Sequence, residues 1–535
     1  MTNDPLYYPY ASRRSLVYGT KGMVATSQPL AAQAGLDMLK QGGNAVDAAI
    51  AAAACLTVVE PSGNGIGSDA FAIVSLKGKM YGLNSSGPAP KALNLETLHQ
   101  AGYKKIPCFG VVPITVPGAP AAWITLSKRF GRLPFAKLLE PAISYAENGF
   151  AISPTISKLW NAAFQLYSAQ ADPAIHSWFS TFAPEGHPLR AGEMWRSIDH
   201  AASLQDIAET ESRTLYGGKL GEKITDFIQK HGGFLSIEDL AAFKPEWVEP
   251  ISVNYRGYDV WELPPNGQGL VVLMALNILK GFDFYGRDDP MTYHRQIEAT
   301  KLAFADGLTH ITDPRYMNVS IQDLLADTYA AKQRERISAT AQTFQSIRPH
   351  NGGTVYLATA DSEGNMVSMI QSNFHGFGSG IVVPGTGVSL QNRGFTFSTD
   401  SHHINCLAPG KRTYHTIIPG FLTKNNQPIG PFGIMGGYIQ PQAHIQVLMN
   451  AIDFHHNPQT ALDAPRWQWI EGNKVEIEAS FPEAMAEKLV RCGHQIVRSA
   501  VGATTFGRGQ IIWRNSFGTL TGATEPRTDG TVAVW

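Results

Sequence analysis

A threonine that follows two glycines, Thr354, has the surroundings that nucleophilic chemistry would need. Gly352 and Gly353 would let the backbone take the strained geometry in which the threonine hydroxyl attacks the carbonyl before it. Cleavage there would leave an N-terminal threonine with a hydroxyl and a free α-amino group, whose ordinary pKa of about 7.7–8.0 suits a general base. Most Gly-Gly-Thr strings only begin a strand, so this feature by itself leaves both interpretations open.

The sequence after Thr354 predicts a β-hairpin. Strand patterns at 354–361 and 365–372 flank a three-residue loop that ends in glycine, the residue that tolerates a left-handed position. In that register Thr354 faces Ser372, with side chains about 4.5–5.5 Å apart on one face of the sheet. Two hydroxyls would then meet at the start of the hairpin. A two-residue loop would place Asn373 opposite the threonine instead.

Helical patterns dominate the chain before this hairpin. One pattern begins at Ser27, which we expect to cap it, and a second, rich in alanine, is capped by Asn44. The other predicted elements are a glycine-rich loop at 63–67, a strand at 70–76, a mainly helical region at 113–345 with a helix at 293–306, strands and glycine turns at 351–437, and a helix at 442–452. The hairpin therefore lies where helical patterns give way to strands.

Composition excludes several classes of protein. The chain has 535 residues, enough for one very large domain or two fused ones, and 43 Lys+Arg against 44 Asp+Glu give a net charge of −1. That balance, without a Lys/Arg run, predicts no nucleic-acid partner and no membrane partner. The longest apolar stretch, residues 45–59, is too short to span a bilayer.

Cysteine and histidine usage indicates neither a disulfide framework nor a cofactor or metal. The four cysteines lie far apart, as in the reduced thiols of a cytosolic protein. The pairs His402-His403 and His455-His456 have no accompanying ligand set. Arg13-Arg14 has no apolar stretch after it, so no export signal is predicted. We therefore expect a cytoplasmic protein.

An ordered set of motifs along nearly the whole chain resembles the γ-glutamyltranspeptidase family, whose precursors cleave themselves before a threonine. The motifs are Gly42-Gly43-Asn44-Ala45-Val46-Asp47-Ala48-Ala49, Val59-Glu60-Pro61, Gly65-Ile66-Gly67, Val116-Pro117-Gly118, Gly131-Arg132-Leu133-Pro134, Glu298-Ala299-Thr300-Lys301-Leu302-Ala303-Phe304-Ala305-Asp306, Phe377-Gly378-Ser379-Gly380, Gly436-Gly437 and Pro526-Arg527-Thr528-Asp529-Gly530. Each motif alone could be chance, whereas their order is specific.

The resemblance implies an α+β fold, the four-layer αββα sandwich of N-terminal-nucleophile hydrolases. It makes Thr354 the nucleophile, Ser372 its contact, and the N–H groups of Gly436 and Gly437 the oxyanion hole. Cleavage between Gly353 and Thr354 would yield a large subunit, residues 1–353, and a small subunit, residues 354–535. The two would form one folded unit as a heterodimer, and a dimer of such heterodimers is left open.

The chain departs from the family at the positions that hold the α-amino and α-carboxylate groups of a γ-glutamyl substrate. It has Asn84 for an arginine, Arg393 and Thr396 for a Gln and an Asp, His415-Thr416 for a serine pair, and Phe374 for an asparagine. A guanidinium would meet the substrate's ammonium with like charge, which disfavours γ-glutamyl substrates. An acidic substrate without an α-amino group fits better, with Arg393, His415, Thr416 and Asn84 as substrate-binding residues.

At these positions the chain most resembles the subgroup of the family that contains oxamate amidohydrolase. Cephalosporin-acylase-like proteins are related to that subgroup. The resemblance implies hydrolysis of oxamate, a small-molecule amide, to oxalate and ammonia, a step in the use of purine nitrogen. Three alternatives stay open: a γ-glutamyl hydrolase or transferase, a cephalosporin or glutaryl acylase, and a processed but inactive metabolite-binding scaffold. His415 could instead be a general base or a satisfied core histidine.

Overall fold

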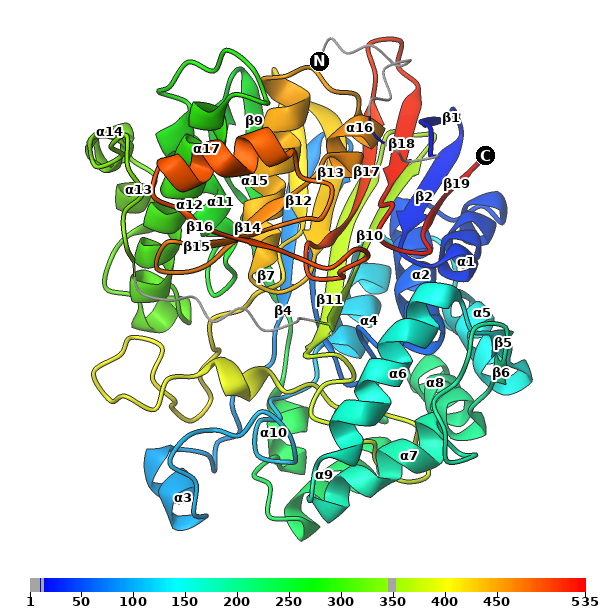
Figure 1. Cartoon of the computed structure of the whole chain (residues 1–535). Helices are drawn as coiled ribbons and strands as arrows, with labels where there is room; N and C mark the ends of the chain where they lie inside the picture. The colour runs from blue at the N-terminus through cyan, green and yellow to red at the C-terminus, as the bar shows by residue number, and fades with distance from the viewer. Residues whose placement is uncertain (1–9, 11–13, 345–352) are drawn as a thin grey trace.

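The computed structural model describes residues 10, 14–344 and 353–535 and is built around two seven-stranded antiparallel sheets (Figure 1). The first sheet has the order β19 (Thr531–Val534), β2 (Gly22–Thr26), β10 (Gly353–Asp361), β11 (Met366–Phe374), β3 (Asp69–Leu76), β4 (Lys79–Ser85) and β7 (Glu246–Val248). The second has the order β1 (Val17–Gly19), β18 (Leu520–Thr524), β17 (Arg508–Arg514), β13 (Gln427–Met435), β12 (Gly420–Lys424), β9 (Tyr258–Glu262) and β8 (Ile251–Tyr255). Each sheet combines strands from before and after Thr354.

Helices cover the outer face of each sheet. On the side of the first sheet lie α1 (Pro29–Lys40), α2 (Ala45–Val59), α4 (Ala119–Phe130), α5 (Phe135–Asn148), α6 (Pro154–Ser168) and α8 (Ile198–Thr210). On the side of the second lie α11 (Gly269–Leu279), α12 (Pro290–His310), α15 (Ile439–Ile452), α16 (Pro458–Asp463) and α17 (Glu483–Arg491). The expected α+β, four-layer αββα sandwich is confirmed.

The smaller elements lie around this sandwich. They are α3 (Leu95–Gln100), α7 (His176–Phe182), α9 (Lys219–Lys230), α10 (Ile237–Ala242), α13 (Ile321–Leu324), α14 (Asp327–Glu335), the pair β5 (Phe150–Ala151) and β6 (Met194–Trp195), and a three-stranded sheet of β14 (Trp467–Glu471), β15 (Lys474–Ile477) and β16 (Gln495–Arg498). No helix in the described ranges is long and apolar enough to cross a membrane.

The alternation of side chains along the central strands separates three hydrophobic cores. Tyr356 and Ile370 point into the core between the two sheets, whereas Leu357 and Met369 belong to the core beneath α1 and α2. Successive residues of a strand point to opposite faces, so residues of the same parity as Tyr356 share the face between the sheets. Thr354 therefore lies on that face.

The first two helices test the N-terminal caps that the sequence predicts. Asn44 caps α2 as expected, accepting the N–H groups of Val46 and Asp47 in a reciprocal capping box. Ser27 does not cap α1, which corrects the expectation. The capping position is Gln28, without a side-chain cap, and the Ser27 hydroxyl donates instead to the buried carboxylate of Glu60.

The central hairpin has the register that the sequence predicts for a three-residue loop. Val355 pairs with Gln371 and Ala360 with Met366, and the turn is closed by the N–H of Asp361 donating to the carbonyl of Asn365 at 3.0 Å. The register shifts by one residue at the open end, next to Thr354. Such a bulge bends a strand and changes the direction of its side chains, and here it lies next to the candidate nucleophile.

Candidate active site

Three polar side chains form a row across the first sheet at one end of the sandwich. The Oγ1 of Thr354 on β10 lies 3.0 Å from the Oγ of Ser372 on β11. Ser372 in turn pairs with Asp69 on β3 in the antiparallel register. All three are buried, and directly paired residues point to the same face. The hairpin thus places two hydroxyls and a carboxylate side by side on adjacent strands.

The Ser372 hydroxyl also contacts the peptide bond before Thr354. Its Oγ–H donates to the carbonyl oxygen of Gly353 at 2.6 Å, and its oxygen accepts the N–H of Phe374 at 2.8 Å. With its one proton given to that carbonyl, Ser372 is left to accept from Thr354. The hydrogen bond from Ser372 would polarise the carbonyl that the Thr354 hydroxyl has to attack.

Gly436 and Gly437 follow β13, where the second sheet reaches the same end of the sandwich. Their φ angles, +137° and +73°, lie in the region that side chains rarely adopt, so glycine is required here. In the part of the chain that the structure describes, neither N–H group donates a hydrogen bond. Free N–H donors on a fixed turn are what a developing oxyanion needs.

The side chain of Gln268 ties this glycine turn to the neighbouring loop. Its Nε2 donates to the carbonyl oxygens of Thr416 at 2.6 Å and Gly437 at 3.0 Å, and its Oε1 accepts from the hydroxyl of Tyr414. Gln268 is fully buried. One amide therefore fixes the candidate oxyanion turn relative to a candidate substrate-binding loop.

Arg393 is a completely buried cation with unused hydrogen-bonding capacity. Its Nη1 donates to the Oγ1 of Thr416 at 2.8 Å, and its Nε lies 3.8 Å from a carboxylate oxygen of Asp69. Its Nη2 has no hydrogen-bond partner among the described residues. Burial lowers the pKa of Arg393 to about 10, so the group remains charged at neutral pH. An unsatisfied buried guanidinium is costly unless an anion joins it.

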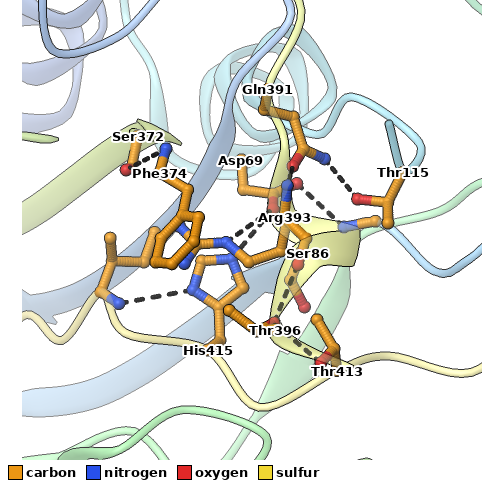
Figure 2. A network of polar contacts seen from close by, with 12 residues as sticks. Asp69, Ser86, Thr115, Ser372, Phe374, Gln391, Arg393, Thr396, Thr413 and His415 are labelled. Atoms are coloured by element: carbon orange, nitrogen blue, oxygen red, sulfur yellow. Dashed lines mark hydrogen bonds and ion pairs between the residues drawn. The ribbon is translucent and has the colours of Figure 1, made fainter. Parts of the chain in front are cut away.

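The ring of Phe374 lies against this guanidinium, 4.4 Å from ring centre to Cζ (Figure 2). Phe374 has a φ of +76°, which is rare for a bulky residue. Strained backbone of this kind persists only where the surrounding structure imposes it, often at functional sites. Phe374 therefore covers one face of Arg393 at the end of β11.

Asp69 and His415 form a buried pair behind Arg393. His415 Nε2 donates to Asp69 at 2.9 Å, while its Nδ1 accepts the N–H of Ile417 (Figure 2). The other oxygen of Asp69 accepts the N–H of Gly87. Burial raises the pKa of Asp69 to about 7, against the opposing effect of Arg393, and burial followed by Arg393 holds the pKa of His415 well below its usual range. His415 is thus neutral, with both ring nitrogens engaged within the protein.

The remaining predicted binding residues sit beside this cluster. The amide of Asn84 donates to the side chain of Asn266 at 2.9 Å and accepts from the N–H and hydroxyl of Ser86. Thr396 bonds to the carbonyl of Arg393 and to Thr413, which holds the short turn carrying the arginine. Asn84 and His415 are therefore placed to support the site, whereas Arg393 keeps a free donor.

Comparison with known proteins shows the family of this chain. The sequence profile described as Gamma-glutamyltranspeptidase matches residues 31–535. The chain belongs to the gamma-glutamyltranspeptidase family. Membership supports a self-processing hydrolase of the N-terminal-nucleophile type that acts on amide bonds.

Similar members of the gamma-glutamyltranspeptidase family are named for different activities. The chain is 36% identical to the glutathione hydrolase-like YwrD proenzyme of Bacillus subtilis, over 96% of this chain and 98% of that protein. It is 34% identical to the oxamate amidohydrolase proenzyme of Klebsiella pneumoniae, over 96% and 98%. A crystal structure titled cephalosporin acylase from Bacillus halodurans superposes with a TM-score of 0.95 at 59% identity, covering 99% of each chain. These relatives share one family and differ in the substrates for which they are named.

Within this gamma-glutamyltranspeptidase fold, a cavity of about 670 Å³ opens beside the candidate nucleophile. Gly353 and Gly436 both line it, so it reaches the carbonyl before Thr354 and the glycine turn. Its other lining residues are mostly apolar and include Leu159, Ala162 and Leu166 of α6, Phe377, Ile439 and Ile470. Arg393, Asp69 and Thr416 are not among its lining residues.

The structure also gathers a group of side chains that sequence spacing did not indicate. His294 Nδ1 lies 2.9 Å from His494 Nε2, and Glu298 lies close to both. Glu298 is paired with the ammonium of Lys301 at 2.8 Å, and His294 Nε2 contacts the carbonyl of Ser338. These partners explain the group as a buried hydrogen-bond network. The histidine pairs at 402–403 and 455–456 are not part of this group.

Two residues of the site escaped the sequence analysis. Asp69 follows the glycine-rich loop at 63–67, and a charged residue beginning an otherwise apolar strand is the signal that could have marked it. Gln268 directly follows Pro264-Pro265-Asn266-Gly267, a turn whose side-chain contacts no local pattern reveals. Gln268 contacts residues 146 to 169 positions away and Asp69 contacts His415 346 positions away, so only the folded chain shows these partners.

Proposed function

We propose that this protein is a self-cleaving amidohydrolase whose N-terminal Thr354 hydrolyses amides of acyl groups that carry a carboxylate but no α-amino group. Oxamate is the smallest such substrate, and a glutaryl amide is a longer one. The observation that carries the proposal is the buried guanidinium of Arg393 with its free Nη2. A carboxylate bound there would gain a charge-assisted hydrogen bond, worth about 1.5–3 kcal/mol.

The surroundings of Arg393 disfavour a γ-glutamyl substrate. The nearby carboxylate, Asp69, has one oxygen on the N–H of Gly87 and the other on His415. An α-ammonium group would therefore find no free anionic partner there, and it would meet the positive charge of Arg393. A substrate with only the carboxylate avoids both costs.

Self-cleavage begins at the Thr354–Ser372 contact. The Thr354 hydroxyl attacks the carbonyl carbon of Gly353 while the Ser372 Oγ–H holds the carbonyl oxygen, and the hydroxyl proton passes to the peptide nitrogen, which leaves as the new α-amino group. Water then hydrolyses the ester between Gly353 and the Thr354 oxygen, which frees the carboxylate of Gly353 and restores the Thr354 hydroxyl. Residues 1–353 and 354–535 would then stay together as a heterodimer. Both central sheets contain strands from each part, which supports that assembly.

Hydrolysis of the substrate would use the same Thr354 hydroxyl, now with the free α-amino group as its base. The free α-amino group of Thr354 takes the hydroxyl proton as the oxygen attacks the substrate carbonyl, and the N–H groups of Gly436 and Gly437 hold the oxyanion. The ammonium then returns that proton to the leaving amine or ammonia. Water hydrolyses the acyl ester by the reverse proton path, releasing the acid and restoring Thr354.

A matched substrate series tests the proposal. The p-nitroanilides of glutarate, pentanoate and γ-glutamate share one leaving group and differ only in the terminal carboxylate and the α-amino group. We expect kcat/KM for the glutaryl amide to exceed both others by about tenfold or more. Ammonia release from oxamate measures the shortest acyl group. Preference for the γ-glutamyl amide would overturn the proposal, and turnover of none would favour the scaffold alternative.

A further inference from the structure

One buried amide connects the two groups that would hold the ends of the acyl group. The Nε2 of Gln268 donates to the carbonyl oxygen of Thr416 at 2.6 Å and to that of Gly437 at 3.0 Å. The Oγ1 of Thr416 accepts from the Nη1 of Arg393 at 2.8 Å, and Gly437 is one of the two glycines of the candidate oxyanion hole. A single side chain therefore links the candidate carboxylate-binding cation to the candidate oxyanion turn.

The side chain of Gln268 is itself held in one orientation. It is fully buried, and its Oε1 accepts from the hydroxyl of Tyr414 at 3.1 Å. Its backbone N–H donates to the carbonyl of His415 at 2.9 Å. Because Tyr414, His415 and Thr416 are consecutive, three contacts fasten Gln268 to one loop. The fourth contact, with Gly437, fixes the separation between that loop and the glycine turn.

The two ends of the acyl group have fixed places in the proposed reaction. The carbonyl oxygen lies at the N–H groups of Gly436 and Gly437, and the carboxylate lies at Arg393. Each CH2 group between them lengthens the acyl group by about 1 Å, and a misplacement of that size can cost about 10²-fold in rate. Whatever fixes the separation of these two places therefore selects the length of the acyl group.

We propose that Gln268 is a positioning residue that determines which length of acyl group the site accepts. It does so by holding Thr416, and with it Arg393, at one separation from Gly437. The inference rests on the proposed function, since it needs the substrate carboxylate at Arg393. Gln268 acts through its neighbours and takes no part in the acyl transfer, yet it decides between the short acyl group of oxamate and a longer one such as glutaryl.

The p-nitroanilides of the dicarboxylic acids from oxalate to adipate test the inference, because they share one leaving group and differ by one CH2 at each step. In the purified, self-cleaved protein we expect kcat/KM to be highest at one length and about tenfold lower at the next lengths. For each substrate the variant is compared with the wild-type protein, so differences in intrinsic reactivity cancel.

Replacing Gln268 by methionine keeps most of the side-chain volume and removes its hydrogen bonds. Gln268→Met should lower kcat/KM about thirtyfold at the preferred length but only about threefold at the other lengths and for the neutral pentanoyl amide. The preference for one length would then disappear. A purely structural role would lower all these values alike, so the comparison of lengths separates the two roles.

Two further variants show whether the effect belongs to this amide. Gln440→Met makes the same replacement at another fully buried glutamine, which accepts the N–H of Ile418, and it should keep the wild-type preference. Tyr414→Phe removes only the hydroxyl that orients Gln268 and should lower kcat/KM about threefold at the preferred length alone. It tests the inference even if Gln268→Met yields no folded, self-cleaved protein.

The outcomes separate this inference from the proposed function. If the wild-type protein prefers glutaryl over pentanoyl amides but shows no preferred length, or keeps that preference in Gln268→Met and Tyr414→Phe, the proposed function stands and the inference is rejected. Equal losses at all lengths, or the same change in Gln440→Met, would also reject it. If glutaryl and pentanoyl amides react equally well, the role of Arg393 fails, and the inference fails with it.

Discussion

The hydroxyl groups of Thr354 and Ser372 lie 3.0 Å apart, and the same Ser372 hydroxyl donates to the carbonyl of Gly353. The candidate nucleophile and the carbonyl it would attack in self-cleavage are thus linked through one serine. Both contacts follow from the hairpin register and the bulge beside Thr354. One hydroxyl therefore serves as a hydrogen-bond partner of both reacting groups.

Replacing Thr354 by alanine should abolish both self-cleavage and turnover, because the attacking oxygen is lost. Intact-mass measurement of the purified chain should show a single uncut species. Thr354→Ser keeps the hydroxyl and should still yield two chains that meet between residues 353 and 354. An unchanged two-chain pattern in the alanine variant would contradict the assignment of the junction.

Replacing Ser372 by alanine should slow self-cleavage by about 10²-fold or more, the usual effect of removing one donor to a developing oxyanion. The rate is followed by the appearance of the two chains on incubation. Ser368→Ala is the matched control on the same strand and face, since the Ser368 hydroxyl contacts only Tyr356 among these side chains. Equal slowing in both variants would indicate a general effect of strand packing.

Replacing Arg393 by glutamine should raise KM for glutaryl amides far more than it lowers kcat, because a contact made equally in ground and transition states changes KM alone. KM for the neutral pentanoyl amide should barely change. Arg393→Lys keeps the charge without the planar fork, so its KM should lie between those of the wild-type protein and Arg393→Gln. A fall in kcat as large as the rise in KM would contradict the role of Arg393 in binding the substrate carboxylate.

The pH dependence of KM should report Asp69, whose pKa burial raises to about 7. Above that pH its ionised carboxylate competes with the substrate carboxylate for Arg393, and below it the protonated group no longer does. KM for glutaryl amides should therefore rise as pH increases through about 7. Asp69→Asn should give the low KM across this range, and KM for pentanoyl amides should be flat. An unchanged profile in Asp69→Asn would contradict the role.

The local sequence predicted much of the fold and part of the site. Alternation and a glycine turn predicted the register of the central hairpin, at whose open end Thr354 contacts Ser372, and Asn44 located the start of α2. Both depend on neighbours within a few residues, where geometry is periodic. The expected cap at Ser27 was wrong: Gln28 is the capping position of α1, and the Ser27 hydroxyl donates to Glu60, the residue directly after α2. Tertiary contacts there outweighed a local preference.

The sequence by itself determined the family, and it gave the threonine after two glycines and the arginine at position 393 on which the proposals rest, because these are matters of residue type and order. Only the tertiary structure decided what surrounds that charge. Asp69 and His415 are 346 positions apart, yet their 2.9 Å contact leaves no free carboxylate for an ammonium group. The cavity beside Gly436 likewise joins α6 to residues after β13. Such contacts arise when two sheets and their helices pack together, and no local pattern encodes them.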